Sequence, residues 1–214
     1  MNKYFTLLIK HETKIKILLV IYTLFCSYKI GLSWDENFYH QTGSINLKYL
    51  LSFGQIDEPF PSKYRYSTLY WSALSFINQM FPQKFSMEVY HILNSFFGLM
   101  TIVGLYKLNK ILFNKNIAKI SAIFLFFIPF FYGHFAINFK DIILAFAYVW
   151  IVYYVYKYVF FENNFKKKLF LIFKISLLSA LGTGVQLLFL GSLIPIILLF
   201  LIVILFYKKK NFKI

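Results

Sequence analysis

The apolar residues of this chain are gathered in long blocks with very few charges, and this feature most limits what the chain can fold into. A helix rises ~1.5 Å per residue, so about 20 apolar residues cross the ~30 Å hydrocarbon layer of a bilayer. Hydrophobic residues make up 59% of the 214 residues, whereas charged residues make up 14%. A soluble domain of this length would not need so much apolar surface. The sequence therefore predicts an all-α integral membrane protein.

The apolar blocks predict about six transmembrane helices in a single membrane domain, residues 1–214. The last apolar stretch, Leu169–Tyr207, is too long for one crossing; Gly191-Ser192 is its predicted turn, and Pro195 is expected to start the final helix. Pro129 is expected to loosen the end of the third span. The predicted spans cover approximately residues 15–32, 88–108, 117–131, 142–160, 169–190 and 192–207.

The formal charge of +15 follows the positive-inside pattern of membrane proteins. Lysines cluster before the first span, between the second and third, after the fourth and at the C-terminus, whereas the alternate loops hold most of the acids. We therefore expect both termini in the cytoplasm and no nucleic-acid partner. Cys26 is the only cysteine, so an internal disulfide and a thiolate metal site are both excluded.

A long outer loop, residues 34–87, follows the first span and is expected to contain interfacial helices. Residues Phe38–Phe53 have the apolar spacing of a helix, which would end at Gly54. Residues Leu69–Phe81 are amphipathic and rich in aromatic side chains, a pattern typical of a helix that lies along the membrane interface.

An acidic pair opens this outer loop. Asp35 and Glu36 follow the first span directly, and His40 lies four residues after Glu36, on the same face of a helix. Adjacent carboxylates point in different directions. We therefore expect one carboxylate to face the reacting groups and the other to orient the reaction or bind a cation. A solvated helix start, where acids suit the helix dipole, is the alternative explanation.

A second polar cluster lies in the short turn after the third span, and consists of His134, Asn138, Lys140 and Asp141. Odd-numbered spans end on the same side of a membrane, so this cluster and the acidic pair can meet there. Charged groups at a membrane surface are costly unless they have a function, so we interpret the clusters as two halves of one active site. The alternative is that Asp141 caps the fourth span while Lys140 extends to lipid head groups.

Other titratable side chains carry weaker signals. His91, near the start of the second span, is predicted to be an interfacial or packing histidine. The acids and histidines have no recognised metal-binding spacing. A divalent cation held by Asp35, Glu36 and Asp141 is nevertheless a candidate cofactor.

At these motifs the chain resembles the GT-C class of membrane glycosyltransferases, especially bacterial relatives of the protein O-mannosyltransferases and of the lipid A aminoarabinose transferase. Residues 35–43, Asp-Glu-Asn-Phe-Tyr-His-Gln-Thr-Gly, are similar to an acidic motif that follows the first span in that class. Residues 133–141, Gly-His-Phe-Ala-Ile-Asn-Phe-Lys-Asp, are similar to a motif after the third span, with Phe139 where proline is usual. Gln186 stands where arginine is common. In that class the chain would form the N-terminal module.

The resemblance implies a location in a bacterial inner (plasma) membrane. It also implies a sugar donor carried on a polyprenyl phosphate and an acceptor, whether protein, lipid or glycan, on the outer face. Lys140 and Arg65 would stabilise the leaving phosphate. Asp35 would be the general base, and direct displacement would invert the anomeric carbon. The remaining residues would orient or bind the substrates: Glu36, Asp141, His134, His40 and Asn138.

Three other functions remain open: a membrane scaffold, a truncated transferase that binds a lipid-linked sugar without turnover, and a small transporter. A transporter is expected to place ionisable groups near the bilayer midplane and to show paired broken helices. The charges here lie at span ends instead, and Lys29 and Lys174 are close enough to an end to extend out of the membrane.

Overall fold

The structure is a computed structural model that describes the backbone of residues 11–55 and 68–211 and the side chains of these residues up to Phe206. All regular elements in these residues are helices, which confirms the predicted fold class. They are α2 Glu12–Lys29, α3 Glu36–Leu51, α4 Leu69–Asn78, the short 3₁₀ helix η1 Gln83–Phe85, α5 Ser86–Leu112, α6 Lys115–Phe127, α7 Pro129–Ile137, α8 Asp141–Phe160, α9 Phe165–Thr183 and α10 Phe189–Asn211.

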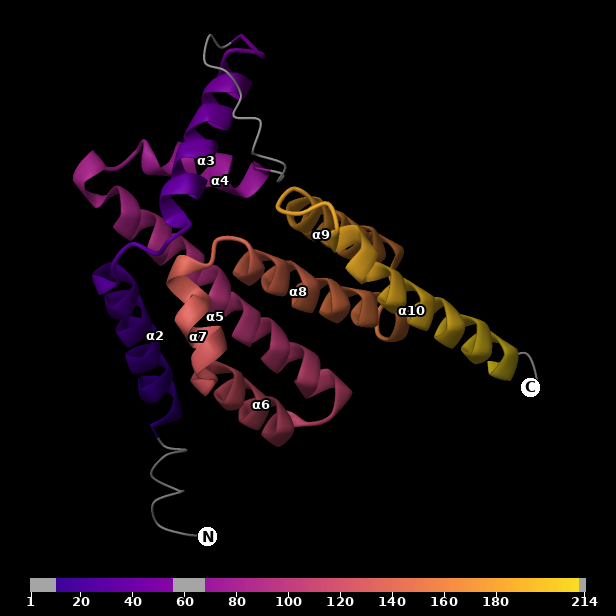
Figure 1. Cartoon of the computed structure of the whole chain (residues 1–214). Helices are drawn as coiled ribbons and strands as arrows, with labels where there is room; N and C mark the ends of the chain where they lie inside the picture. The colour runs from indigo at the N-terminus through magenta and orange to yellow at the C-terminus, as the bar shows by residue number, and fades with distance from the viewer. Residues whose placement is uncertain (1–10, 56–67, 212–214) are drawn as a thin grey trace.

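The long helix α5 is the central element. Helices α2, α6, α7 and α8 pack along it, α9 and α10 continue the layer beyond α8, and α3 and α4 lie at the end where α5 begins (Figure 1). Gly104 allows the close approach of α8, because a Cβ at this position would lie 2.9 Å from atoms of both Val149 and Trp150. Trp150 Nε1 also donates to the carbonyl of Met100 at 3.0 Å. Helices α5 and α8 are therefore in direct contact around Gly104.

Three described helices are each long and apolar enough to cross a membrane: residues 83–112, 141–160 and 189–206. Helices α6 and α7 add a fourth if they form one span that is bent by 65°. Helices α2 and α9 are long enough, but each carries four charged residues. The chain is thus an all-α membrane protein, and the number of six spans stays a prediction.

Two predicted boundaries in the membrane region are wrong. The turn between the last two helices lies at residues 184–188 rather than at Gly191-Ser192, because the side-chain-free Gly182 leaves room for the ring of Phe189 and lets the chain reverse early. Pro195 consequently lies inside α10 and does not start it. Pro129 does more than loosen a helix end: it occupies the first position of α7 and separates α7 from α6.

Both helices predicted in the outer loop are present. Helix α3 ends where Phe53 and Gly54 adopt positive φ angles of 53° and 91°. Helix α4 packs directly on α3, and Gly43 makes this contact possible because a Cβ there would lie 2.5 Å from the backbone oxygen of Trp71. The two helices thus form a closely packed pair at the end of α5.

Candidate functional site

The side chains around the start of α5 form a buried core that joins segments far apart in the sequence. They come from α4, α5, the α7–α8 turn, the start of α8 and the α9–α10 turn, and comprise Tyr70, Trp71, Leu74, Tyr90, Phe139, Ile143 and Val185. The backbone N–H of Leu69 also donates to the carbonyl of Gly184 at 3.1 Å. This core holds both predicted polar clusters at one end of the molecule.

The two acids of the first cluster lie in different environments. Asp35 precedes α3 and is exposed, whereas Glu36 is completely buried. The Oε2 atom of Glu36 lies 3.1 Å from Nε2 of His91, which is itself 1% exposed. The two atoms are close enough for an ion pair when the ring is protonated, but they are not aligned for a hydrogen bond. A buried carboxylate without hydrogen bonds is costly, so this pair is an unusual feature of the site.

Phe139 connects the first cluster to the second. Its ring is 1% exposed and lies parallel to the ring of His91, with centroids 6.3 Å apart and an interplanar angle of 10°. Edge contacts join the same ring to Tyr39 on α3, at 6.1 Å, and to Tyr90 on α5, at 5.8 Å. The clusters therefore meet through an aromatic contact, because Phe139 lies directly between Asn138 and Lys140 in the sequence.

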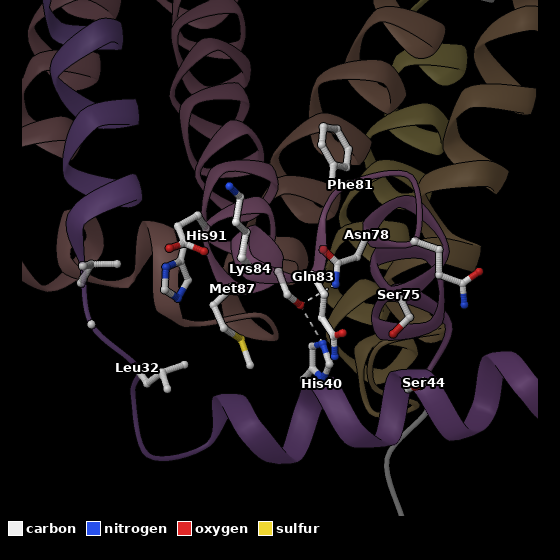
Figure 2. A pocket seen from close by; sticks show the side chains of 15 residues that line it. Leu32, His40, Ser44, Ser75, Asn78, Phe81, Gln83, Lys84, Met87 and His91 are labelled. Carbon is white, nitrogen blue, oxygen red and sulfur yellow. Dashed lines mark hydrogen bonds between the residues drawn. The ribbon is translucent and has the colours of Figure 1, made fainter.

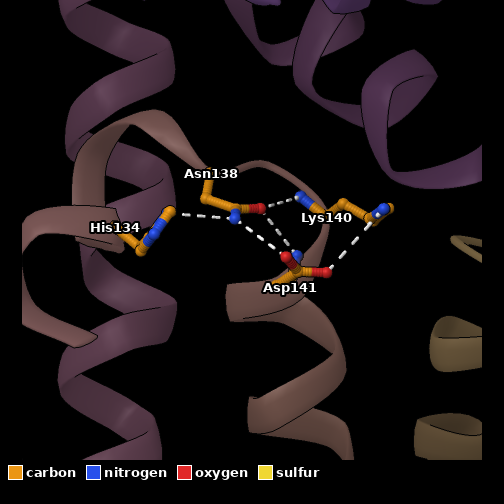
Figure 3. Close-up of polar contacts among 4 residues, drawn as sticks. All are labelled: His134, Asn138, Lys140 and Asp141. Atoms are coloured by element: carbon orange, nitrogen blue, oxygen red, sulfur yellow. Dashed lines mark hydrogen bonds and ion pairs between the residues drawn. The ribbon is translucent and has the colours of Figure 1, made fainter. Parts of the chain in front are cut away.

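The second cluster is a hydrogen-bonded turn organised by Asn138 (Figure 3). The Asn138 Nδ2 atom donates to Asp141 Oδ2 at 2.9 Å and lies 3.0 Å from His134 Nδ1. Its Oδ1 atom accepts from the backbone N–H groups of Lys140 and Asp141, so the Asn138 side chain satisfies the first N–H group of α8, which begins at Asp141. The Nζ atom of Lys140 lies 3.9 Å from Asp141 Oδ1, which places a cation and an acid side by side.

Asn94 fixes this turn to α5. Its Nδ2 atom donates to the carbonyls of Phe135 and Asn138 at 2.8 and 3.0 Å, and its Oδ1 atom accepts from the hydroxyl of Tyr70 at 3.0 Å. Helix ends leave carbonyl groups without intrahelical partners, and Asn94 satisfies that of Phe135 near the end of α7 and that of Asn138 just after it. The fully buried Asn94 therefore links α4, α5 and the second cluster.

A cavity of about 760 Å³ opens beside the first cluster, between the end of α2, α3 and the α4–α5 connection (Figure 2). His40 and Asn78 both reach Ser86 in its wall: His40 Nε2 lies 3.0 Å from the hydroxyl, and Asn78 Nδ2 donates to it at 2.6 Å. Burial lowers the pKa of His40 below its ordinary value of 6.5, so the ring is neutral at neutral pH. Glu88 and His91 also line the cavity, which therefore offers both hydrogen-bond donors and acceptors.

The structure brings some of the predicted site residues together and separates others. His134, Asn138, Lys140 and Asp141 form one network, and His40 lines the cavity. Arg65 lies outside the described residues. Among the residues that the structure describes, no group of three or more His, Cys, Asp or Glu side chains is arranged to hold a metal ion, so the structure does not assemble the cation site suggested for Asp35, Glu36 and Asp141.

His91 is the residue that sequence reasoning undervalued. It was expected at an interface or in packing, and it is indeed packed, but it is also the partner of Glu36 and part of the cavity wall. The available signal was its position: His91 and Asn94 are polar residues that share one face of a helix otherwise suited to the membrane.

Comparisons with known proteins give one family. A family model described as dolichyl-phosphate-mannose-protein mannosyltransferase matches residues 69–213, which is more than half of the chain. The matched region includes α4, the α7–α8 turn and His91, and it begins after Asp35 and Glu36. No curated protein and no solved structure matches the chain.

Proposed function

The chain belongs to the dolichyl-phosphate-mannose-protein mannosyltransferase family, and on that premise we propose that it moves a sugar from a polyprenyl-phosphate-linked donor to an acceptor on the non-cytoplasmic face of a bacterial inner membrane. The family match over residues 69–213 is the observation that carries this proposal. The meeting of two polar clusters at one end of a membrane protein supports it.

The second cluster is the proposed site for the donor phosphate. As the glycosidic bond breaks, negative charge accumulates on the phosphate oxygens, and a fixed cation next to them lowers the barrier. Lys140 is the cation that the Asn138 turn presents, and Asp141 beside it keeps the ammonium group in place. Arg65 is proposed as a second cation.

The first cluster is the proposed site of acceptor activation. A general base must reach the acceptor hydroxyl, and Asp35 is the open carboxylate of the pair, whereas Glu36 is buried against His91. We therefore propose Asp35 as the base and Glu36 as a positioning residue that fixes the start of α3. Attack by the acceptor from the face opposite the phosphate inverts the anomeric carbon.

The cavity beside α3 is the proposed acceptor site. Its described lining carries one cation, Lys84, and one carboxylate, Glu88, so its formal charge is balanced when His40 and His91 are neutral. Amides and hydroxyls make up much of the rest of its polar wall, including Asn78 and Ser86. Such a wall suits a neutral, hydroxyl-bearing acceptor better than a phosphate.

The test combines donor binding with turnover. The protein is purified gently from its own membranes, and native mass spectrometry is used to look for a bound polyprenyl-phosphate sugar. We expect this lipid on the wild type and its loss in a Lys140→Ala variant. No such lipid on the folded wild type would favour a scaffold, whereas a bound lipid without measurable transfer would favour a truncated transferase that binds the donor without turnover.

Asp35→Asn tests the assignment of the base. We expect this variant to insert normally and retain the donor, but to lose about 10²–10⁴-fold in transfer rate, the usual contribution of a general base. Glu12→Gln, an acid-to-amide change at the start of α2, outside both polar clusters and the acceptor cavity, is the matched control and should keep its activity. A well-inserted, fully active Asp35→Asn variant would show that another group takes the proton.

A further inference from the structure

A second cavity, of about 310 Å³, lies at the end of the molecule away from α3 and α4, where α5 and α8 end and α9 begins. Four lysines line it: Lys107 from α5, Lys157 from α8, and Lys167 and Lys174 from α9. Glu162 is the one acid among its lining residues. The proposed function uses none of these side chains.

Aromatic rings hold three of these ammonium groups at defined positions. Lys107 Nζ lies 4.9 Å from the ring centroid of Trp150, and Lys157 Nζ lies 5.8 Å from that of Tyr153. Lys174 Nζ contacts two rings, at 4.2 Å from Phe170 and 5.0 Å from Tyr154. A cation over an aromatic face is attracted by the ring quadrupole, so these lysines are preorganised instead of extending freely into water.

The positive-inside pattern explains on which side these lysines lie but not why they line one cavity. Like charges around a small volume repel each other, and no lysine of the four forms an ion pair with an acid among the described residues. Lys174 is only half exposed and lies well inside α9. The cavity therefore has an excess of positive charge that an anion would balance.

Exposed apolar side chains on α9, where Phe170 lines the cavity and Phe173 follows one turn later, indicate the kind of anion. On α9, Phe170 and Phe173 are 58% and 62% exposed, as is usual for side chains that face lipid in a membrane protein. An anion that also carries acyl chains would place its phosphate against the lysines and its chains along these rings. We propose that this cavity binds the phosphate of an anionic lipid head group, on the face of the membrane opposite the proposed transfer site.

The test measures the stabilisation of the purified protein by defined lipids. The wild type in neutral phosphatidylcholine nanodiscs is compared with the wild type in nanodiscs that also contain phosphatidylglycerol or cardiolipin. We expect the anionic lipids to raise the melting temperature by about 2–4 °C. The double variant Lys157→Gln/Lys174→Gln should lose most of this rise, and Lys157→Arg/Lys174→Arg should keep it.

The matched control is Lys110→Gln/Lys115→Gln, which removes the same charge near the same end of α5 from residues that do not line the cavity. This control should respond to anionic lipid as the wild type does. An equal loss of response in both glutamine variants would show that only the overall positive charge matters, and would overturn the site. If inorganic phosphate raised the melting temperature equally in neutral nanodiscs, the cavity would bind a soluble phosphate compound. That result would overturn the proposal of a lipid ligand.

Discussion

At the scale of single residues, the least expected arrangement is the contact of Glu36 with His91. Both side chains are buried. Neither the Glu36 carboxylate nor the His91 imidazole makes a hydrogen bond with another described group. Removing one partner of such a pair leaves the other buried and alone, which typically costs about 3–5 kcal/mol. Replacing both by apolar residues of similar volume is far less costly, because no unpaired polar group remains.

We therefore expect Glu36→Leu and His91→Leu each to destabilise the protein strongly, and the double variant to be more stable than the sum of the two effects predicts. The measurement is a double-mutant cycle on the melting temperature or on denaturant unfolding in detergent. Additive effects would mean that the two side chains do not interact. Activity gives a second readout, since a positioning role predicts that the stable double variant still has a reduced transfer rate.

At the scale of helices, apolar blocks and apolar spacing predict where most elements occur, but not where the turn between the last two helices lies. The apolar spacing in the outer loop correctly predicts α3 and α4, and the long apolar blocks correctly predict helices at α5 and α8. The predicted turn before α10 is wrong because the length of an apolar block does not show where its chain reverses. In the structure, the reversal lies where the ring of Phe189 packs on Gly182. The meeting of Phe139 with His91 was also beyond sequence reasoning, since it depends on how α5 packs on the α7–α8 turn.

The contact between α3 and α4 gives a prediction at this scale. A Cβ at Gly43 would meet the backbone of Trp71, which cannot turn aside as a flexible side chain can. We expect Gly43→Ala to destabilise the protein by about 1–3 kcal/mol and to disturb the acceptor cavity. Gly133→Ala is the control, because its added Cβ meets no other described part of the protein within 4 Å and alanine favours the α7 helix. Equal melting temperatures for both variants would show that α3 and α4 are not closely packed.

At the scale of the whole molecule, the two ends differ in chemistry. The end with α3 and α4 holds a turn of balanced charge and a cavity of amides and hydroxyls, whereas the other end holds the lysine-lined cavity. Lysine-rich ends of membrane proteins face the cytoplasm. We therefore predict that the end with the lysine-lined cavity faces the cytoplasm and that the end with α3 and α4 faces the outside.

Labelling of single cysteines in intact cells tests this orientation. In a Cys26→Ser background, Trp34→Cys lies beside the acidic pair at a position that is 98% exposed, and Phe113→Cys lies between α5 and α6 at a position that is 63% exposed. We expect a membrane-impermeant maleimide to label the cysteine at position 34 from outside and the one at position 113 only after permeabilisation. Labelling of position 113 from outside, with position 34 labelled only after permeabilisation, would mean the opposite orientation and place the transfer site in the cytoplasm. Labelling of both positions from outside would mean that α5 does not cross the membrane, since the two positions lie at its opposite ends.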